Sequence, residues 1–458
     1  MSRAGSSRGG QAGFTLIELT VALVAGLAVV LGLMALSREA SRTFNEEVRS
    51  TASEASLRTA NDRLRADLAR AGFMSTGNIQ TDPRVCLPLG TTFANLMPAP
   101  PAGIKSLQSI QLSIGGSAAA LPLSASQTPA LSPSIIWIAG NMTTAEDLPV
   151  LSQAPAPSGS CTRLTISPVS PALYRIVSQA SASPGQDLAN AFQPVSGKTF
   201  IVRLVDETSS AQFLETCTSE TTVAGFDGSG LPYVDVDNAT PILAPKNTST
   251  RCGVGTISSG HVYVNPVQIV RWEIVQASVA EATNTSQYSK ALGNEPTAAG
   301  TVDPNKYDLI RSYADITTGG LPPLYASTEV VAEYAVDLDF AFSVDTGTST
   351  SPSMQTYAFE DNTDNKANTQ DVSTVATSRP QRLREVRFRI VTRTAQGDRT
   401  VNVQVAAPAN YSNQEYLYRY CINPTSCVKA TPDGTFCWAR ARTVTGEVSL
   451  PNLQADFF

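Results

Sequence analysis

An uncharged apolar run from Leu19 to Leu36 limits what this chain can fold into more than any other feature of its sequence. The run holds eighteen residues without a charged side chain. In a helix this length corresponds to roughly 27 Å, close to the thickness of a bilayer core. A short leader with Arg3 and Arg8 but no acidic residue precedes it. We therefore predict one membrane-spanning helix near the N-terminus.

A single acidic residue, Glu18, stands at the beginning of this run. A carboxylate inside a membrane helix costs about 2.5 kcal/mol or more, so its presence needs an explanation. Either a positive group pairs with it, or it lies near the headgroups at a helix N-terminus, where the helix dipole favours an acid. A secretory signal does not explain the leader, because its cleavage site would follow the apolar region, whereas Gly13 precedes it.

The stretch 13–18, GFTLIE, resembles the class III signal of type IV pilins and the related pseudopilins. In that family a prepilin peptidase cleaves after the glycine and methylates the new amino group. The resemblance implies that Gly13 is the cleavage position and Phe14 the methylated residue. It also implies that Glu18 pairs with the N-terminal amine of a neighbouring subunit and sets the register of assembly.

Helical periodicity continues beyond the apolar run, and neither Pro nor Gly follows until Gly72. We predict one helix over 15–73, whose second half buries a single apolar stripe against a sheet. The predicted stripe comprises Phe44, Val48, Ala52, Ala55, Leu57, Ala60, Leu64, Leu68 and Ala71. The ending at 67–73, DLARAGF, is similar to that of the PilW group of minor pilins.

The remainder of the chain is rich in Ser, Thr, Ala, Val, Gly and Pro and poor in Lys, which is typical of a β-rich extracytoplasmic domain. We predict an α+β fold in which the long helix packs on an enlarged antiparallel β-rich head. The predicted divisions are a cleaved leader (1–13), the transmembrane half (14–36) and the amphipathic half (37–73) of the helix, a loop- and strand-rich inserted head region (74–260) and a C-terminal antiparallel β head (261–458).

Short apolar runs with β-branched residues predict the strands of the head. These runs lie at 134–138, 163–167, 173–177, 199–205, 307–313, 329–344 and 386–391. We predict a helical turn at 188–192, loops over 206–260, and a polar insert over 345–378. Two hairpins are predicted, one through Asn265-Pro266 and one through 396–398 into 401–405. The order of elements between 270 and 388 also resembles that of PilW-type heads.

Seven cysteines and one histidine, His261, bear on metal and disulfide chemistry. No C-x-x-C pair exists and one imidazole cannot complete a usual zinc site, so we predict disulfides in an extracytoplasmic compartment with one thiol left over. Connectivity stays open. The pairs to try first are Cys217 with Cys252 and two among Cys421, Cys427 and Cys437.

The sequence contains no catalytic constellation, phosphate-binding loop or dinucleotide fingerprint, so we expect no enzyme and no cofactor. Calcium binding is a hypothesis for the acidic stretches 235–238 and 360–365, with turn formation as the alternative. The net charge of −6 argues against nucleic-acid binding. We predict that the arginines of one strand lie on its wet face, at a guarded sheet edge with acidic neighbours for pairing. These are Arg379, Arg382, Arg384, Arg387, Arg389 and Arg393.

The resemblance as a whole implies a minor pilin of a type IV pilus that primes filament assembly in a minor-pilin complex, with display at the pilus tip as a further implication. The implied partners are the prepilin peptidase, other minor pilins, the major pilin, a large tip adhesin and the inner membrane. The protein would cross the inner membrane once before assembly and then reach the pilus at the cell surface. Two alternatives stay open: a pseudopilin of a type II secretion system, and an adhesive or ligand-binding module on a pilin stem.

Overall fold

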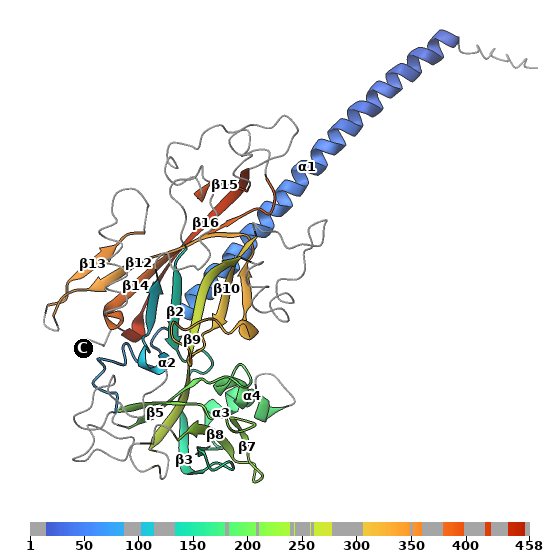
Figure 1. Cartoon of the computed structure of the whole chain (residues 1–458). Coiled ribbons are helices and arrows are strands. Elements are labelled where there is room, and N and C mark those ends of the chain that lie inside the picture. Colours follow the sequence, from blue (N-terminus) through green and yellow to red (C-terminus); the bar gives the residue numbers. More distant parts are fainter. Residues whose placement is uncertain are drawn as a thin grey trace, which may run out of the picture. The chain divides into compact units, whose positions relative to one another are not determined.

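The computed structural model describes residues 15–86, 102–113, 133–178, 183–207, 210–238, 242, 257, 261–276, 306–348, 351–359, 379–397, 417–422 and 438–453. The chain divides into two compact units, residues 1–52 and 53–458, and each is described by itself. Figure 1 shows a long helix, α1, and strands that gather into two antiparallel sheets. The predicted α+β class is confirmed.

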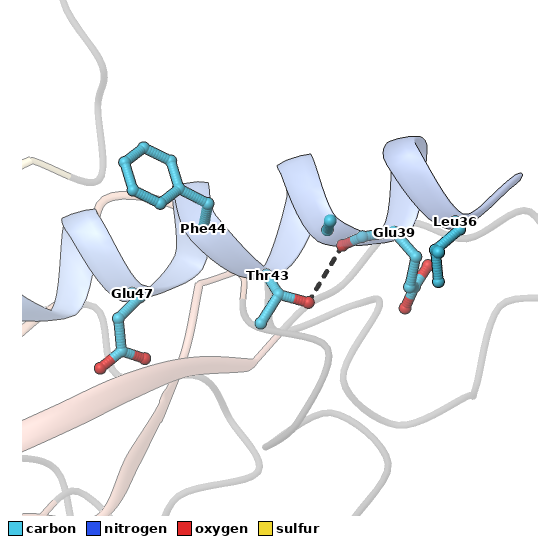
Figure 2. Close-up of a pocket in the computed structure, with 6 residues that line it drawn as sticks. Leu36, Glu39, Thr43, Phe44 and Glu47 are labelled. Atoms are coloured by element: carbon cyan, nitrogen blue, oxygen red, sulfur yellow. Dashed lines mark hydrogen bonds between the residues drawn. The ribbon is translucent and has the colours of Figure 1, made fainter. Parts of the chain in front are cut away.

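Helix α1 spans Leu16–Ala69, 54 residues, so the predicted single helix is confirmed to within a few residues at its ends. In the second unit one side of α1 is buried in the core through Leu57, Ala60, Leu64 and Leu68, and Ala71 is buried in the turn just after the helix. The predicted stripe was too long: Phe44, Val48, Ala52 and Ala55 are exposed, and Figure 2 shows Phe44 at an open depression along α1. At about 100° per residue these four positions fall on a different side of the helix from the buried row.

The larger sheet has eleven strands and is built around β9 (Val262–Gln276). The first half of β9 pairs with β3 (Leu148–Pro155) and β5 (Ile201–Asp206), and its second half with β2 (Ile135–Gly140) and β10 (Tyr307–Tyr313). The other strands are β1 (Ile110–Ser113), β4 (Cys161–Ile166), β6 (Ala211–Glu215), β7 (Ala224–Phe226), β8 (Pro232–Asp237) and β11 (Glu329–Ala332).

The hairpin predicted through Asn265-Pro266 is wrong, because β9 runs straight through both residues. On one edge of β9, pairing with β3 ends at Val264 and pairing with β2 begins at Gln268. The Asn265 side chain is buried and donates to Met74 O at 2.8 Å. A local turn signal is therefore overridden by pairing with distant strands.

Two short helices, α3 (Pro171–Ser178) and α4 (Pro184–Phe192), share a hydrophobic core with β3, β4 and β8. The helical turn predicted at 188–192 is confirmed within α4. The strand predicted at 173–177 is wrong, because that run forms α3. Its first turn is stabilised by Ser170, whose Oγ accepts the N–H of Leu173 at 3.4 Å. The loops predicted over 206–260 are also incorrect in part, since β6, β7 and β8 lie there.

A second sheet has the strand order β13-β12-β14-β16-β15. Its strands are β13 (Met354–Tyr357), β12 (Ala335–Asp345), β14 (Leu383–Arg393), β16 (Trp438–Ser449) and β15 (Arg419–Cys421). The predicted strands at 307–313 and 386–391 are confirmed as β10 and as part of β14. The run predicted as one strand at 329–344 forms two strands, β11 in the larger sheet and β12 in this one, and 401–405 lies outside the described residues. Short helical elements complete the fold: α2 (Ala102–Lys105), η2 (Tyr325–Ser327), η3 (Pro380–Arg382) and η6 (Pro451–Leu453).

Candidate functional site

The N-terminal end of α1 is closed by Thr15 and Glu18. The Thr15 N–H donates to Glu18 Oε2 at 2.9 Å and the Thr15 hydroxyl donates to the same oxygen at 3.1 Å, while the Glu18 N–H donates to Thr15 Oγ1 at 3.3 Å. This arrangement is a capping box, which satisfies N–H groups that have no partner within the helix. Sequence reasoning missed this local role, although the T-x-x-E spacing signals it. Gly13 and Phe14 lie outside the described residues.

Apolar side chains cover all sides of α1 from Leu16 to Leu36. The large ones among them are between 46% and 79% exposed, and Glu18 is the one charged residue of this stretch. By length and composition, α1 can cross a membrane. An apolar surface of this size is unfavourable in water and is typical of a segment that enters a bilayer or packs with other proteins.

A buried ion pair holds the other end of α1 within the second unit. Asp67 is 4% exposed and accepts hydrogen bonds from Arg311 Nε at 2.7 Å, Arg311 Nη2 at 3.2 Å and Trp272 Nε1 at 2.9 Å. Trp272 and Arg311 lie opposite each other on β9 and β10. One carboxylate of the helix thus joins two strands of the larger sheet.

The turn after α1 depends on Gly72 and on a hydrogen bond to the last turn of the helix. Gly72 has a φ of +71°, in the left-handed region that favours glycine after a helix. The side chain of Asn452 donates to Ala69 O at 3.0 Å and so satisfies a carbonyl of the last turn. The ending therefore combines an ion pair through Asp67 with a glycine turn.

Comparison with known proteins finds no match: no family model, curated protein or solved structure matches the chain.

Among the residues that the structure describes, those considered for metal binding are not gathered in one place. Within the described ranges, no group of three or more His, Cys, Asp or Glu side chains could hold a metal ion. His261 is exposed and pairs with Glu207. Asp235 is buried in β8, where both its oxygens accept hydrogen bonds from Arg163 at 2.7 and 2.8 Å. The second acidic stretch, 360–365, lies outside the described residues, so calcium binding there stays a prediction.

Four of the six arginines predicted on one strand lie on β14, whereas Arg379 and Arg382 precede it at η3, and β14 does not lie at a sheet edge. It pairs with β12 on one side and β16 on the other. Arg389 and Arg393 are 5% and 2% exposed, so the predicted wet edge is wrong for this strand. Arg389 Nη2 lies 3.1 Å from Asp339 Oδ2 and 3.4 Å from Asp337 Oδ2, and for Arg389 the predicted acidic pairing is confirmed.

Cys217 forms its disulfide with Cys161, across a sequence separation of 56 residues. The predicted pairing of Cys217 with Cys252 is therefore wrong. The backbone explains why Cys161 is the partner of Cys217. Cys161 begins β4, which pairs with β8, and Cys217 donates its N–H to Asp235 O on β8, so both cysteines lie beside the same strand. Cys86 and Cys421 are also disulfide-bonded. The other candidates, Cys252, Cys427 and Cys437, lie outside the described residues.

A carboxylate pair near this disulfide makes the stability of the head depend on pH. Glu215 lies next to the Thr216–Val236 bridge, which places it opposite Asp237. Burial, with a further contribution from the charge of Asp237, raises the pKa of Glu215 to about 7. Because this pKa exceeds that of the unfolded chain, the folded state binds the proton more tightly. Protonated Glu215 therefore adds to the free energy of unfolding. This contribution is fully present below the pKa of Glu215 in the unfolded chain and is lost as the pH rises through about 7.

We expect Glu215→Gln to raise the free energy of unfolding at pH 8 by about 1 to 2 kcal/mol, a value reduced for solvent screening. The amide has no charge to bury beside Asp237. Urea denaturation of the full chain in detergent at pH 8 and at pH 5 measures the difference, with the pH 5 pair as the internal control. A gain of the same size at both pH values would contradict the assignment.

Proposed function

We propose that the chain is a membrane-anchored, pilin-like filament subunit of the PilW-type minor pilin class, which primes assembly together with other pilins. The observation that carries this proposal is one continuous helix, α1, whose first half is apolar on all sides and whose last turn is ion-paired to the sheet. Such a helix combines a membrane anchor with a packing surface for neighbouring subunits, and the GFTLIE motif at 13–18 supports the same reading.

The role proposed for the chain is structural, and the head is the part displayed outside the membrane. Processing after Gly13 would leave Phe14 as a free N-terminus one residue before the capping box. Glu18 would then lie within reach of amines at the N-terminal ends of neighbouring helices, where burial of a carboxylate in the membrane requires a positive partner. Anchoring, display and register together describe a subunit of an assembled filament.

Substitutions of Glu18 test the proposal, because the capping box separates two roles of this side chain. Glu18→Gln retains the hydrogen bonds of the box, since glutamine also serves in capping boxes, but removes the charge. We expect incorporation into surface filaments to fall at least tenfold for both Glu18→Gln and Glu18→Ala, with processing after Gly13 intact. The measurement is immunoblotting of sheared filaments against the membrane fraction.

Thr15→Ala is the matched control, because it removes the capping hydroxyl and leaves the carboxylate in place. We expect this variant to assemble at more than half the normal level. Normal incorporation of Glu18→Gln would contradict the charge-pairing role of Glu18. The capping hydrogen bonds alone would then account for a glutamate at this position. Normal pili together with blocked export of secreted proteins in a deletion strain would favour the type II secretion pseudopilin instead.

A further inference from the structure

A two-residue link, Glu333-Tyr334, joins β11 of the larger sheet to β12 of the second sheet. On the side of the larger sheet, Asp308 of β10 accepts the Tyr334 N–H at 3.1 Å. On the side of the second sheet, the N–H of Arg393, at the end of β14, donates to Tyr334 O at 2.9 Å. Tyr334 has a φ of +53°, in the left-handed region that is unfavourable for residues other than glycine. The conformation of the link therefore depends on these contacts.

One lysine lies between the two carboxylates at this link. Lys306, just before β10, is 4% exposed. Its Nζ lies 2.9 Å from Glu333 Oε1 but 4.0 Å from Asp308 Oδ2. The surroundings of the two acids differ, because the Asp308 side chain is fully buried whereas that of Glu333 is 50% exposed. Among the residues that the structure describes, none forms a hydrogen bond with Asp308 Oδ2.

The shorter contact of Lys306 is with the carboxylate that needs a positive partner less. A buried, ionised carboxylate is costly without such a partner, whereas water solvates a half-exposed one. An ionised Asp308 would therefore draw the Lys306 ammonium to hydrogen-bonding distance. The observed separation of 4.0 Å fits a neutral Asp308, which leaves the ammonium to Glu333.

The groups around Asp308 determine the pH at which it ionises. Burial raises the pKa of this carboxyl to about 6, so the folded chain favours the neutral acid. Glu333 adds to the rise of this pKa, and the residue opposite on β9, Val275, is uncharged. The groups that oppose the rise are Lys306, the Tyr334 N–H and Arg393. Asp308 is thus mainly neutral below about pH 6 and mainly ionised above it.

We propose that Lys306 is a proton-controlled switch at the link between the sheets: it pairs with Glu333 while Asp308 carries a proton, and moves to Asp308 when that proton is lost. A shift of about 1 Å brings the 4.0 Å contact to hydrogen-bonding distance. The folded-state pKa of Asp308 lies above its value in the unfolded chain. The stabilisation by the neutral acid is therefore complete below the unfolded pKa and is lost as the pH rises through about 6.

The variant Glu333→Gln tests the switch, because it removes the charge of a half-exposed side chain and leaves Lys306 and Asp308 in place. The measurement is urea denaturation of the full chain in detergent at pH 5.5 and at pH 8. We expect the unfolding equilibrium constant to rise about threefold at pH 5.5, as is typical of a half-exposed ion pair, and less than about 1.5-fold at pH 8. Each variant is compared with its parent at the same pH, so the titration of Glu215 cancels.

The variant Asp308→Asn provides the matched background, because its side chain is neutral at both pH values. In this background we expect Glu333→Gln to have the same effect, about threefold, at pH 5.5 and at pH 8. An equal effect of Glu333→Gln at both pH values in the chain that retains Asp308, or no effect at pH 5.5, would overturn the proposal.

Crystal structures of the full chain at pH 5 and at pH 8 measure the position of Lys306 directly. We expect its Nζ within about 3.2 Å of Glu333 at pH 5. At pH 8 we expect it within about 3.2 Å of Asp308 and more than about 4 Å from Glu333. A lysine that keeps its contact with Glu333 at pH 8 and stays beyond hydrogen-bonding distance of Asp308 would show that no exchange of partners occurs.

Discussion

Replacing Asp67 with alanine is expected to lower the free energy of unfolding of the head by about 3 kcal/mol, because it leaves the buried Arg311 guanidinium with only the half-exposed Glu329 carboxylate, 3.8 Å from Arg311 Nη1. Arg311 is 6% exposed and Trp272 is fully buried, so both donors lie away from bulk water. The indole N–H of Trp272 would also lose its acceptor. Urea denaturation of the full chain in detergent, followed by tryptophan fluorescence, measures the change.

Two controls separate the ion pair from a general effect of substitution on α1. Asp62→Ala removes an exposed acid of the same helix, and we expect a change below about 0.5 kcal/mol. The double variant Asp67→Leu with Arg311→Met removes both charges, and we expect it to be more stable than Asp67→Ala alone, because neither charge is then left unpaired. A loss below about 1 kcal/mol for Asp67→Ala would contradict the assigned role.

Removing the disulfide between Cys161 and Cys217 is expected to cost about 4 kcal/mol. The bond closes a loop of 56 residues, and a cross-link of that span restricts the unfolded chain by roughly this amount. It also joins the beginning of β4 to the second residue after β6, in the part of the head where β3, β4 and β8 share a core with α3 and α4. The variant with both residues changed to alanine, compared by urea denaturation with the parent chain, gives the loss.

Hydrogen exchange of the same variant tests which part of the head the disulfide stabilises. We expect amides of β4 and β8 to lose protection, while those of β12 and β14 in the other sheet keep it, because the cross-link restrains the part of the head around β4 and β8 directly. Equal loss of protection in both sheets, or a change in unfolding free energy below about 1 kcal/mol, would contradict this account.

Local patterns in the sequence predicted the elements whose neighbours are close along the chain. The helix α1 follows from its unbroken periodicity, and β10 and β14 follow from β-branched residues and alternation. Failures occurred where distant strands decide the outcome. Asn265-Pro266 has the sequence of a turn but pairs with β5 inside β9. The run at 173–177 was wrong for a different, local reason, because Ser170 caps a helix that begins just after it.

The candidate site was predicted unevenly for the same reason. Glu18 could be predicted because a single charged residue beside a long apolar run is evident from the sequence alone. The ion pair of Asp67 with Arg311 joins positions 244 residues apart, and no local signal connects them. Phe44, Val48, Ala52 and Ala55 were merged with the buried row, although the two-residue step from Ala55 to Leu57 turns about 200° around the helix and so leaves that side.

The most direct test of the central claim is mass spectrometry of filaments sheared from the cell surface, with a search for the tryptic peptide from Phe14 to Arg38. The account predicts that this peptide is present, begins at Phe14 and carries one methyl group on its N-terminal amine. An intact N-terminus before Gly13, or absence of the chain from filaments while it is abundant in the membrane fraction, would contradict the proposal that this is a processed filament subunit.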